Sequence, residues 1–500
     1  MRFVICLVAA CHALQPATNM PSTSRSPRLL AAKMQSSDDK EQRRSLDREM
    51  LSIGGPALVG LAIDPLASLV DTAMIGRFCQ PADLAGAGVA ISVYNLASRT
   101  FNFLSSATTS QVAALMPVDG EAGVFDGGMS RAASSALAVA VSIGLCLAVL
   151  MTVGGGTMLS LLGVSSASEI RAPARRYLAV RALAFPASLS LMALEGAFRG
   201  ARDTSTPLFS LSLASALNLL LDPILIIGLR GGVAGAALAT AIAQYAAVIV
   251  LWRRMAARCG EACSTSELTI LGLPKPSTGE MRSIAANGSW LTVRTFAGSS
   301  TLAFSSLTTA ALGAAAGAAH QICFQLWLAV SLLADAVAVA AQALTASAIA
   351  RQDGRTVRLL CQRTLTLGAL GGACTATLLA LAGGPLCAAF TTDAAVRAAA
   401  AAAWPVVAWT QPLNTLAFAV DGLLFGASDF RFCATLFVTA ALPAIGLMSL
   451  ATRATALGGA AAGLRYVWAG LGVFMAMRTL IGLARIASGS GPWQVLNDDR

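Results

Sequence analysis

Residues Leu51–Gly76 read LSIGGPALVGLAIDPLASLVDTAMIG, and they decide the fold of the chain. The stretch matches the length of a membrane-spanning helix, which needs about 20 apolar residues. It nevertheless carries two carboxylates, Asp64 and Asp71. A carboxylate near the bilayer centre costs roughly 2.5–3.5 kcal/mol on insertion scales, so it is rarely kept there without a function. We expect the other spans to surround this one. In the alternative, Asp71 lies at the membrane surface near the end of the helix, where it only caps a helix or pairs with a basic residue.

The composition indicates a membrane protein with many spans. Of the 500 residues, 56% are hydrophobic and 12% are charged, whereas soluble domains carry about 25% charged residues. A backbone inside a bilayer must satisfy its own hydrogen bonds, so we expect helices. The net charge is +10. The basic residues lie mostly between apolar runs and form no stripe with aromatic residues, so we expect no nucleic-acid partner.

Twelve apolar segments predict an all-α membrane protein of twelve transmembrane helices. They lie near residues 51–75, 86–116, 129–154, 173–198, 205–229, 232–252, 284–311, 317–349, 357–385, 394–426, 430–450 and 457–484. The longest polar connection, Arg253–Arg282, follows the sixth segment and reads as a linker. We therefore expect a six-helix bundle at 51–252, a linker at 253–283, a second bundle at 284–486 and a tail at 487–500.

Residues 1–50 read as a leader followed by a charged tail. Met1–Ala13 has the pattern of a signal peptide, and Leu14–Ser37 has the Ser-rich, basic and acid-free composition of a transit peptide. The two in series resemble a bipartite plastid leader. We therefore expect a plastid envelope protein, with a disordered tail and another cellular membrane as the alternatives.

Basic residues favour one side of the predicted membrane. The segment before the first span and the even-numbered connections are the richer in Lys and Arg, with residues such as Arg43, Arg44, Arg199, Arg202, Arg253, Arg254, Lys275, Arg351 and Arg355. Loops rich in Lys and Arg stay on the side of insertion. Both termini are therefore expected in the cytosol, or in the stroma for a plastid membrane.

The two halves of the chain repeat. Glu195–Asp203, EGAFRGARD, closes the fourth span, and Asp421–Asp429, DGLLFGASD, closes the tenth. Gln111 and Gln342 likewise lie late in the second span of each half. Two halves with six spans each have the same orientation in the membrane, and transporters built in this way bind substrate between the halves. We therefore expect pseudo-symmetric bundles around a cleft, and the substrate-cleft candidates are Asp64, Glu195, Gln111, Asp335, Gln342 and Asp421.

Polar residues of the fifth and sixth spans point to a cation site. Asn218 and Asp222 share one helical face because they are four residues apart. Pro223 frees backbone carbonyls nearby, and Thr240 adds a hydroxyl. If Asp71 and Asp222 face one cavity, they can carry a proton or hold Na⁺ with Asn218 and Thr240, and both alternatives stay open. Taken singly, Asn218 and Thr240 also suit contacts between helices.

The second half holds two further acids. Asp335 lies seven residues before Gln342 and so on the same face of one span, and Asp421 lies within the tenth span. Either acid can contact a cationic substrate or titrate. Structural pairing with Arg294 or Arg478, which also lie in apolar runs, is the equal alternative.

Several absences argue against an enzyme or a motor. The chain has no Gly-Lys dipeptide and hence no phosphate-binding P-loop. It has two histidines, His12 and His320, and no HExxH motif. Its eleven cysteines include no CxxC pair, which argues against a metal site. We expect no cofactor beyond H⁺ or Na⁺ as the coupling ion.

The run Asp64–Arg77, DPLASLVDTAMIGR, resembles the first span of multidrug and toxic compound extrusion (MATE) transporters, nearest the branch with bacterial DinF and plastid or plant members. The resemblance covers residues 48 to 486, and further matching stretches are Phe198–Pro207, Asn218–Pro223, Gly235–Thr240, Ala318–Ile322, Leu333–Gln342 and Asp421–Phe430.

The resemblance implies two six-helix bundles that alternate access to a central cleft as H⁺ or Na⁺ enters and the solute leaves. It implies that Asp71, Asn218, Asp222 and Thr240 form an amino-terminal cation site. Relatives with an acid in the seventh span differ from this chain, because Trp290–Leu312 has none.

The expected function is a monomeric secondary antiporter that exports an organic cation, a xenobiotic or an organic acid across a lipid bilayer. A flippase for a lipid-linked molecule is the alternative. It predicts basic residues along the cleft, and the candidates are Arg99, Arg181, Arg294 and Arg478. A third hypothesis, a non-transporting scaffold, predicts that the buried acids can be neutralised without loss of function.

Overall fold

The structure is a computed structural model, and it describes residues 43–61, 81–117, 122–161, 169–262, 273–390 and 393–497, together with Ile63, Met74, Phe78 and Cys79. The described residues form helices and no strand. Residues 1–42, which include the predicted leader, lie outside the described residues, and residues 43–50 of the predicted tail are helical. Asp64 and Asp71 also lie outside the described residues.

Two helical lobes make up the molecule. The N lobe contains the helix of residues 43–61 and α3 (Pro81–Thr100), α4 (Phe103–Ala114), α5 (Gly127–Leu161), α6 (Arg171–Ala182), α7 (Phe185–Gly200), α8 (Ser205–Asp222), η1 (Pro223–Gly228) and α9 (Gly232–Ala262). The C lobe contains α10 (Thr278–Ala311), α11 (Ala314–Ala350), α12 (Gly354–Phe390), α13 (Ala394–Trp409), α14 (Gln411–Gly426), α15 (Phe430–Ser449), α16 (Ala451–Ala487) and η2 (Gly491–Leu496).

The predicted fold class, an all-α membrane protein of two pseudo-symmetric bundles, is confirmed. In the described parts of the chain, seven helices are long and apolar enough to cross a membrane, or eight when α6 and α7, bent by 49°, count as one span. The other predicted spans are helical too. Two of them are each divided into two helices, one into α3 and α4 and the other into α13 and α14. α10 is long, and polar residues such as Asn287 and Arg294 lower its hydropathy.

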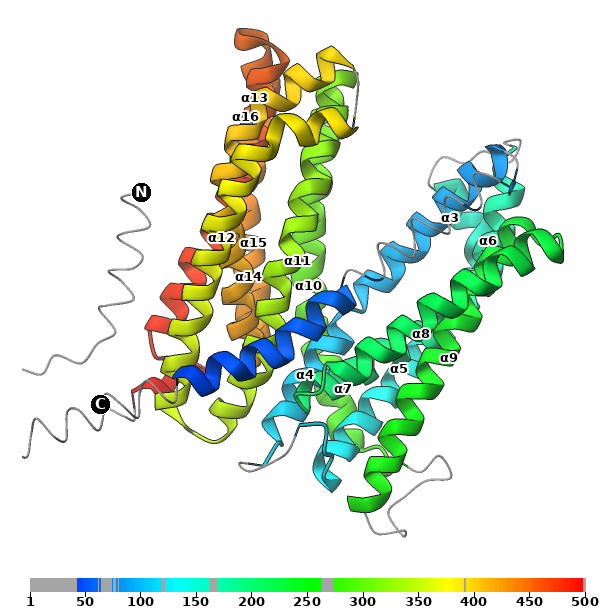
Figure 1. Cartoon of the computed structure of the whole chain (residues 1–500), viewed down its shortest axis with the longest axis vertical. Helices are drawn as coiled ribbons and strands as arrows, with labels where there is room; N and C mark the ends of the chain where they lie inside the picture. The colour runs from blue at the N-terminus through cyan, green and yellow to red at the C-terminus, as the bar shows by residue number, and fades with distance from the viewer. Residues whose placement is uncertain are drawn as a thin grey trace, which may run out of the picture.

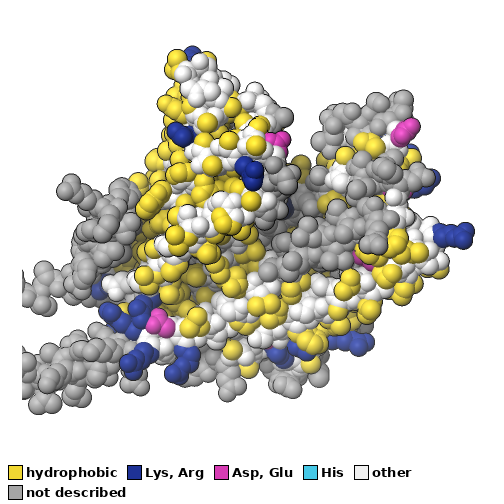
Figure 2. All heavy atoms as spheres, turned by 45° about the horizontal axis from the view of Figure 1, so that its top comes forward, with side chains coloured by type: hydrophobic (Ala, Val, Ile, Leu, Met, Phe, Trp, Pro, Cys, Tyr) yellow, Lys and Arg dark blue, Asp and Glu magenta, His cyan; other side chains and the backbone are white. Residues whose placement is uncertain are grey.

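The lobes meet at one end and stand apart at the other, so that the molecule has the shape of a V (Figure 1). At the joined end α4 packs against α10 and α11. Ser110 Oγ donates to the Phe425 carbonyl at 2.7 Å, and Arg351 Nη2 donates to the Pro117 carbonyl at 2.8 Å. Figure 2 shows the two lobes separated at their free ends. The cleft between the bundles is therefore open at that end.

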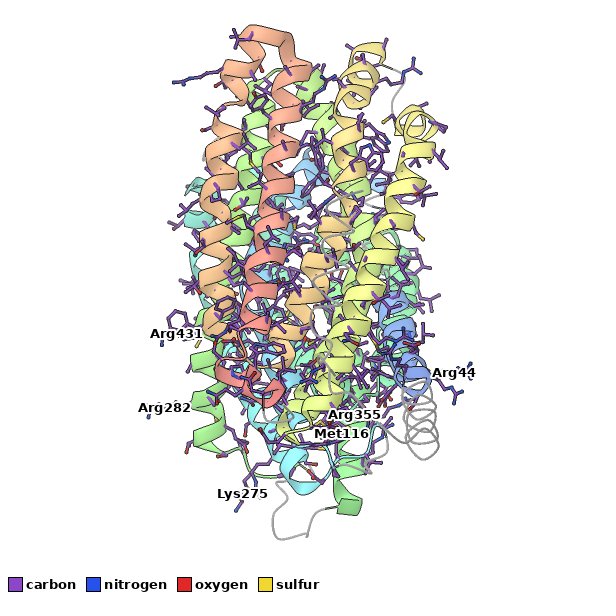
Figure 3. The ribbon with its side chains drawn as sticks, turned by 90° about the vertical axis from the view of Figure 1, so that its left-hand side faces the viewer. Arg44, Met116, Lys275, Arg282, Arg355 and Arg431 are labelled. Carbon is purple, nitrogen blue, oxygen red and sulfur yellow. The ribbon has the colours of Figure 1, made fainter. Side chains whose placement is uncertain are left out.

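The joined end of the V is the basic end. Figure 3 labels Arg44, Lys275, Arg282 and Arg355 there, on segments far apart in the sequence. The sides of both lobes carry many hydrophobic side chains (Figure 2). The cleft therefore opens at the end opposite the basic one.

The helix of residues 43–61 ties the lobes together at the basic end. Leu46, Met50 and Ile53 follow helical spacing and lie in the apolar core of the C lobe. On the other side, Glu49 forms an ion pair with Arg202 of the N lobe. Thr204 Oγ1 also donates to the Ile53 carbonyl at 2.8 Å. This helix therefore belongs to both lobes by its contacts.

The nonapeptide repeat has one structural meaning in both lobes. A Cβ on Gly196 would lie 2.5 Å from the Ser105 carbonyl oxygen, and a Cβ on Gly422 would lie 2.5 Å from that of Ala338. Glycine is therefore required where α7 packs on α4 and where α14 packs on α11. After each helix, Asp203 pairs with Arg258 and Asp429 pairs with Arg485, at 2.9 and 2.8 Å.

Candidate functional site

The predicted polar residues of the fifth and sixth spans lie together inside the N lobe. Asp222 ends α8 with 0% of its surface exposed, and Asn218, one turn earlier, is 5% exposed. Asn218 Nδ2 donates to Thr240 Oγ1 of α9 at 3.4 Å, and Thr240 Oγ1 donates to the Ala236 carbonyl at 2.9 Å. The three residues provide a carboxylate, an amide and a hydroxyl. Their oxygen atoms can coordinate a hard cation such as Na⁺, and the carboxylate alone can take up a proton.

A short π-helix, η1, follows Asp222 directly. Pro223 has no N–H to continue α8, and the Leu229 N–H donates to the Ile224 carbonyl at 2.8 Å. Interruptions of this kind are frequent at functional sites. α9 packs closely on η1, because a Cβ on Gly235 would lie 2.4 Å from the Leu225 carbonyl oxygen. The contact fixes Thr240 on α9 relative to Asp222.

Asp71 was predicted to share this cation site, and Asp64 was predicted to line the cleft. Both fall outside the described residues, so both remain predictions. Within the described ranges, no three His, Cys, Asp or Glu side chains cluster as a metal site of those ligands would require.

A charge cluster lies in the C lobe. Asp421 on α14 is 3% exposed, and its Oδ2 accepts from Arg294 Nη2 at 2.7 Å and from Arg478 Nη2 at 2.6 Å. The Phe437 ring lies 4.3 Å from each guanidinium carbon. Sequence analysis left structural pairing and substrate contact as equal alternatives for Asp421. The structure shows the pairing, with both arginines at once.

Further charged groups lie near this cluster. Asp335 on α11 is within electrostatic range of Arg294, Arg478 and Arg199. Arg199 belongs to the N lobe and pairs with Glu195 at 2.9 Å. Phe425, whose carbonyl accepts from Ser110 of the N lobe, lies 4.8 Å from the Arg294 guanidinium carbon. The predicted cleft residues Glu195, Asp335 and Asp421 therefore gather where the lobes meet.

The two glutamines predicted for the cleft lie at the contact between the lobes. Gln342 Nε2 donates to the Ser106 carbonyl at 2.8 Å and to Ser110 Oγ at 3.1 Å. Gln111 Nε2 donates to Ser283 Oγ at 3.4 Å. Both side chains therefore help to close the basic end in this conformation.

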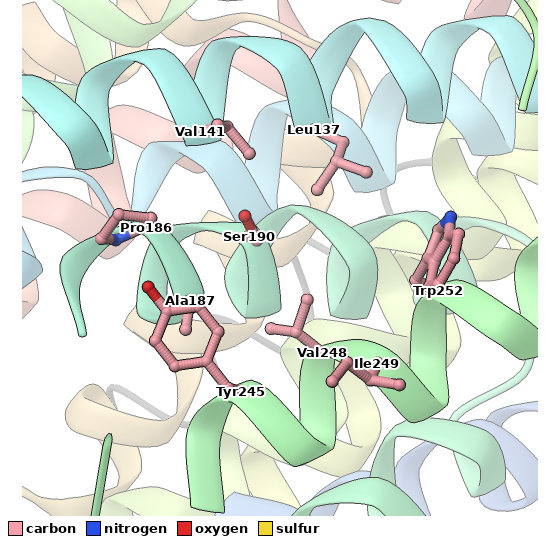
Figure 4. Close-up of a pocket in the computed structure, with 9 residues that line it drawn as sticks. All are labelled: Leu137, Val141, Pro186, Ala187, Ser190, Tyr245, Val248, Ile249 and Trp252. Carbon is pink, nitrogen blue, oxygen red and sulfur yellow. The ribbon is translucent and has the colours of Figure 1, made fainter. Parts of the chain in front are cut away.

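A pocket of about 280 Å³ lies between α5, α7 and α9, away from these polar residues (Figure 4). Its lining is apolar apart from Ser190 and the tip of Tyr245, whose hydroxyl donates to the Leu183 carbonyl at 2.8 Å. Val141 and Ile249 at its edge are 37% and 45% exposed. The pocket opens on an apolar outer face, and it is separate from the candidate cation site.

One polar network escaped the sequence analysis. Arg181 was a cleft candidate only, yet its Nη1 donates to Gln244 Oε1 at 2.8 Å inside the N lobe. Ser188 Oγ donates to the same oxygen at 2.7 Å and also contacts the Tyr94 hydroxyl. The spacing of Thr240 and Gln244, four residues apart on α9, was the signal that could have linked Gln244 to the cation site.

The chain matches known proteins over most of its length. The profile of the MatE family matches residues 56–224 and 292–450. Protein DETOXIFICATION 44, chloroplastic, of Arabidopsis thaliana is 35% identical over 454 residues, which are 90% of this chain and 84% of that protein. DNA damage-inducible protein F of Escherichia coli is 32% identical over 206 residues, 41% of this chain and 43% of that protein.

Solved structures of low sequence identity share the fold. A crystal structure of MATE in the straight conformation superimposes with a TM-score of 0.76, at 17% identity, over 89% of this chain and 96% of that one. An outward-facing multidrug resistance MATE family transporter gives a TM-score of 0.75 at 18% identity, over 89% and 97% of the two chains. The sequence repeat, the V of two lobes and the family profile over more than half of the chain agree, and this protein belongs to the MatE family of multidrug and toxic compound efflux transporters.

Proposed function

We propose that this transporter is an antiporter that exports an organic solute in exchange for H⁺ or Na⁺ bound in the N lobe. Asp222 carries the exchanged charge, and Asn218 and Thr240 complete its oxygen ligands. Asp71 is the second carboxylate of the proposed site. The solute passes through the cleft between the lobes, which opens alternately to the two sides of the membrane.

The burial of Asp222 is the observation that supports this proposal most. A carboxylate with 0% of its surface exposed, at the junction of α8 and η1, is costly inside a membrane. Protonation or a bound Na⁺ removes that cost. The site therefore has a higher affinity for the cation when it is sealed from water than when it is exposed to water. This difference is the differential binding that can drive a change between two conformations.

The charge cluster bears on the class of solute. Asp421 is already paired with two arginines, which reduces its attraction for an organic cation. The Arg294 side chain is 23% exposed and can meet an acidic group of a solute. We propose that organic acids are better solutes than organic cations. The flippase alternative also uses exposed arginines, and it predicts transport that ignores the H⁺ and Na⁺ gradients.

We propose the plastid envelope as the location of the protein. Relatives named chloroplastic are 35% identical over about 90% of this chain, and the leader has the composition of a transit peptide. The basic end of the V then faces the stroma, and the cleft opens away from it. Imaging of residues 1–50 fused to a fluorescent protein tests this location.

Transport by purified protein in liposomes tests the function. Organic acids and organic cations are screened under an imposed H⁺ gradient and then under an imposed Na⁺ gradient. We expect one of the gradients to raise solute flux in wild type at least tenfold over the flux in Asp222→Asn. Asp353→Asn is the control, because Asp353 is exposed and only caps α12 through the Thr356 N–H. The proposal is contradicted if the imposed gradient raises solute flux equally in wild type, Asp222→Asn and Asp353→Asn.

A further inference from the structure

Arg181 is a buried cation in the N lobe that the proposed exchange does not use. It lies in the last turn of α6 and is 8% exposed. Its guanidinium carbon lies 4.2 Å from the centre of the Tyr94 ring, and its Nη1 donates to Gln244 Oε1 at 2.8 Å. The Tyr94 ring belongs to an apolar core cluster that also contains Tyr177 and Phe185. A guanidinium cannot give up its proton in a protein, so the charge remains.

No carboxylate of the described residues lies within 4.0 Å of Arg181, in contrast to Arg294 and Arg478. A buried charge without a counter-charge is strongly unfavourable. One hydrogen bond, from Nη1, links Arg181 to the described residues, although a guanidinium has five N–H donors. The position therefore has an excess positive charge and donors to spare.

The Arg181 position is linked to the candidate cation site along α9. Gln244 lies one helical turn after Thr240, on the same face. Thr240 in turn accepts from Asn218, one turn before Asp222. Gln244 Oε1 also accepts from the Ser188 hydroxyl, which in turn contacts the Tyr94 hydroxyl. The buried cation and the buried carboxylate thus lie at the two ends of one polar chain.

We propose that Arg181, positioned by Gln244 and Tyr94, is an anion-binding site of the N lobe. Its ligand is a small anion with oxygen or halide character, either a carboxylate group of the solute or an inorganic anion. The proposal deepens the proposed transport function and rests on it for its role in the cycle. Binding itself is independent of any gradient. The bound anion compensates the charge of Arg181, and the cation bound at Asp222 compensates the charge of that carboxylate.

Equilibrium binding to the purified full-length chain tests the site. Sodium chloride and sodium acetate are titrated calorimetrically into protein in a HEPES buffer that keeps the sodium concentration constant. We expect saturable binding of at least one of the two anions to wild type. Arg181→Gln should weaken it by roughly tenfold or more, because charge-assisted hydrogen bonds are lost. Arg181→Lys, which keeps the charge, should retain part of the affinity.

The control is Arg176→Gln, since Arg176 is exposed on the same helix and should bind anions within twofold of wild type. Acetate alone identifies the solute carboxylate as the ligand, chloride alone identifies an inorganic anion, and competition between them identifies one shared site. Equal affinity in wild type and Arg181→Gln overturns the proposal. No binding to wild type together with binding to Asp71→Asn also overturns it, because Asp71 would then be the permanent counter-ion. If the anion binds as expected but no cation gradient drives solute transport, the proposed exchange is wrong and the anion site stands.

Discussion

At the scale of single residues, Asp421 carries the clearest energetic consequence. Replacing it with Asn leaves the buried Arg478 and the partly exposed Arg294 side by side without their carboxylate. Removing one partner of a buried ion pair costs about 3–5 kcal/mol. We expect a large fall in the thermal unfolding temperature of Asp421→Asn in detergent, and partial recovery when Arg478→Met is added. An unfolding temperature equal to that of wild type would show that the cluster adds nothing to stability.

Asp203 provides a pH dependence outside the membrane. Burial raises the pKa of its carboxyl, but hydrogen bonds from Thr206 and the charge of Arg258 outweigh burial and hold the pKa below its usual value. The ionised form therefore stabilises the folded state at neutral pH, and this contribution is lost as the pH falls below about 4, the ordinary value for Asp. We expect the stability difference between wild type and Asp203→Asn to shrink from pH 6 to pH 3. A difference that stays constant or grows would contradict this prediction.

Residue-level prediction succeeded where partners lie close in the sequence. Asn218 and Asp222 are one turn apart, and Thr240 lies in the next span, so spacing alone could group them. The partners of Asp421 come from helices 127 and 57 residues away. Spacing cannot indicate such a contact, because it depends on how α10, α14 and α16 pack.

At the scale of the elements, the contact between η1 and α9 controls the geometry of the candidate cation site. Gly235→Ala adds a Cβ about 2.4 Å from the Leu225 carbonyl oxygen, which forces α9 away from η1. We expect loss of cation-driven transport and a lower unfolding temperature. Gly228→Ala is the matched control, because its Cβ would have no atom nearer than 3.9 Å. Equal effects of the two substitutions would show that the close approach is unimportant.

The helices themselves were largely predictable, and their interruptions were not. Apolar runs near 173–198 and 394–426 each predicted one span, but the structure divides them between α6 and α7 and between α13 and α14. Pro186 and Pro412 follow these breaks, and each lies 2.5 Å from a Cβ built on a glycine of the neighbouring helix, Gly144 or Gly372. Hydropathy averages over such a break, so only the packing reveals it.

At the scale of the whole molecule, polar contacts hold the lobes together at the basic end. Gln342→Ala removes two hydrogen bonds to α4. We expect the free ends to approach each other more often, as measured by the distance between spin labels at Arg176 and Arg397 in a chain without its native cysteines. The control is Gln362→Ala on α12, whose main neighbours α11, α13 and α14 belong to its own lobe. An unchanged distance distribution in Gln342→Ala would contradict the role of this contact.

The repeat predicted the two lobes, and the charge bias predicted that basic residues gather at one end, because both are averages over many residues. The side of the membrane that this end faces stays a prediction. The direction in which the cleft opens was beyond the sequence. In the proposed cycle the same chain adopts both conformations, and the energy difference between two such states is only a few kcal/mol. The contacts of Gln342 and Arg202 at the basic end are those of one of them.

Coupling of Asp222 to the movement of the lobes is tested most directly by the same distance between labels at Arg176 and Arg397. It is measured in lipid nanodiscs at pH 8 and pH 5, and with and without Na⁺. We predict that one of these changes shifts the distribution in wild type and in Asp353→Asn, while Asp222→Asn stays fixed in one distribution. A shift of equal size in Asp222→Asn would contradict the assignment of Asp222 as the group through which the cation moves the lobes.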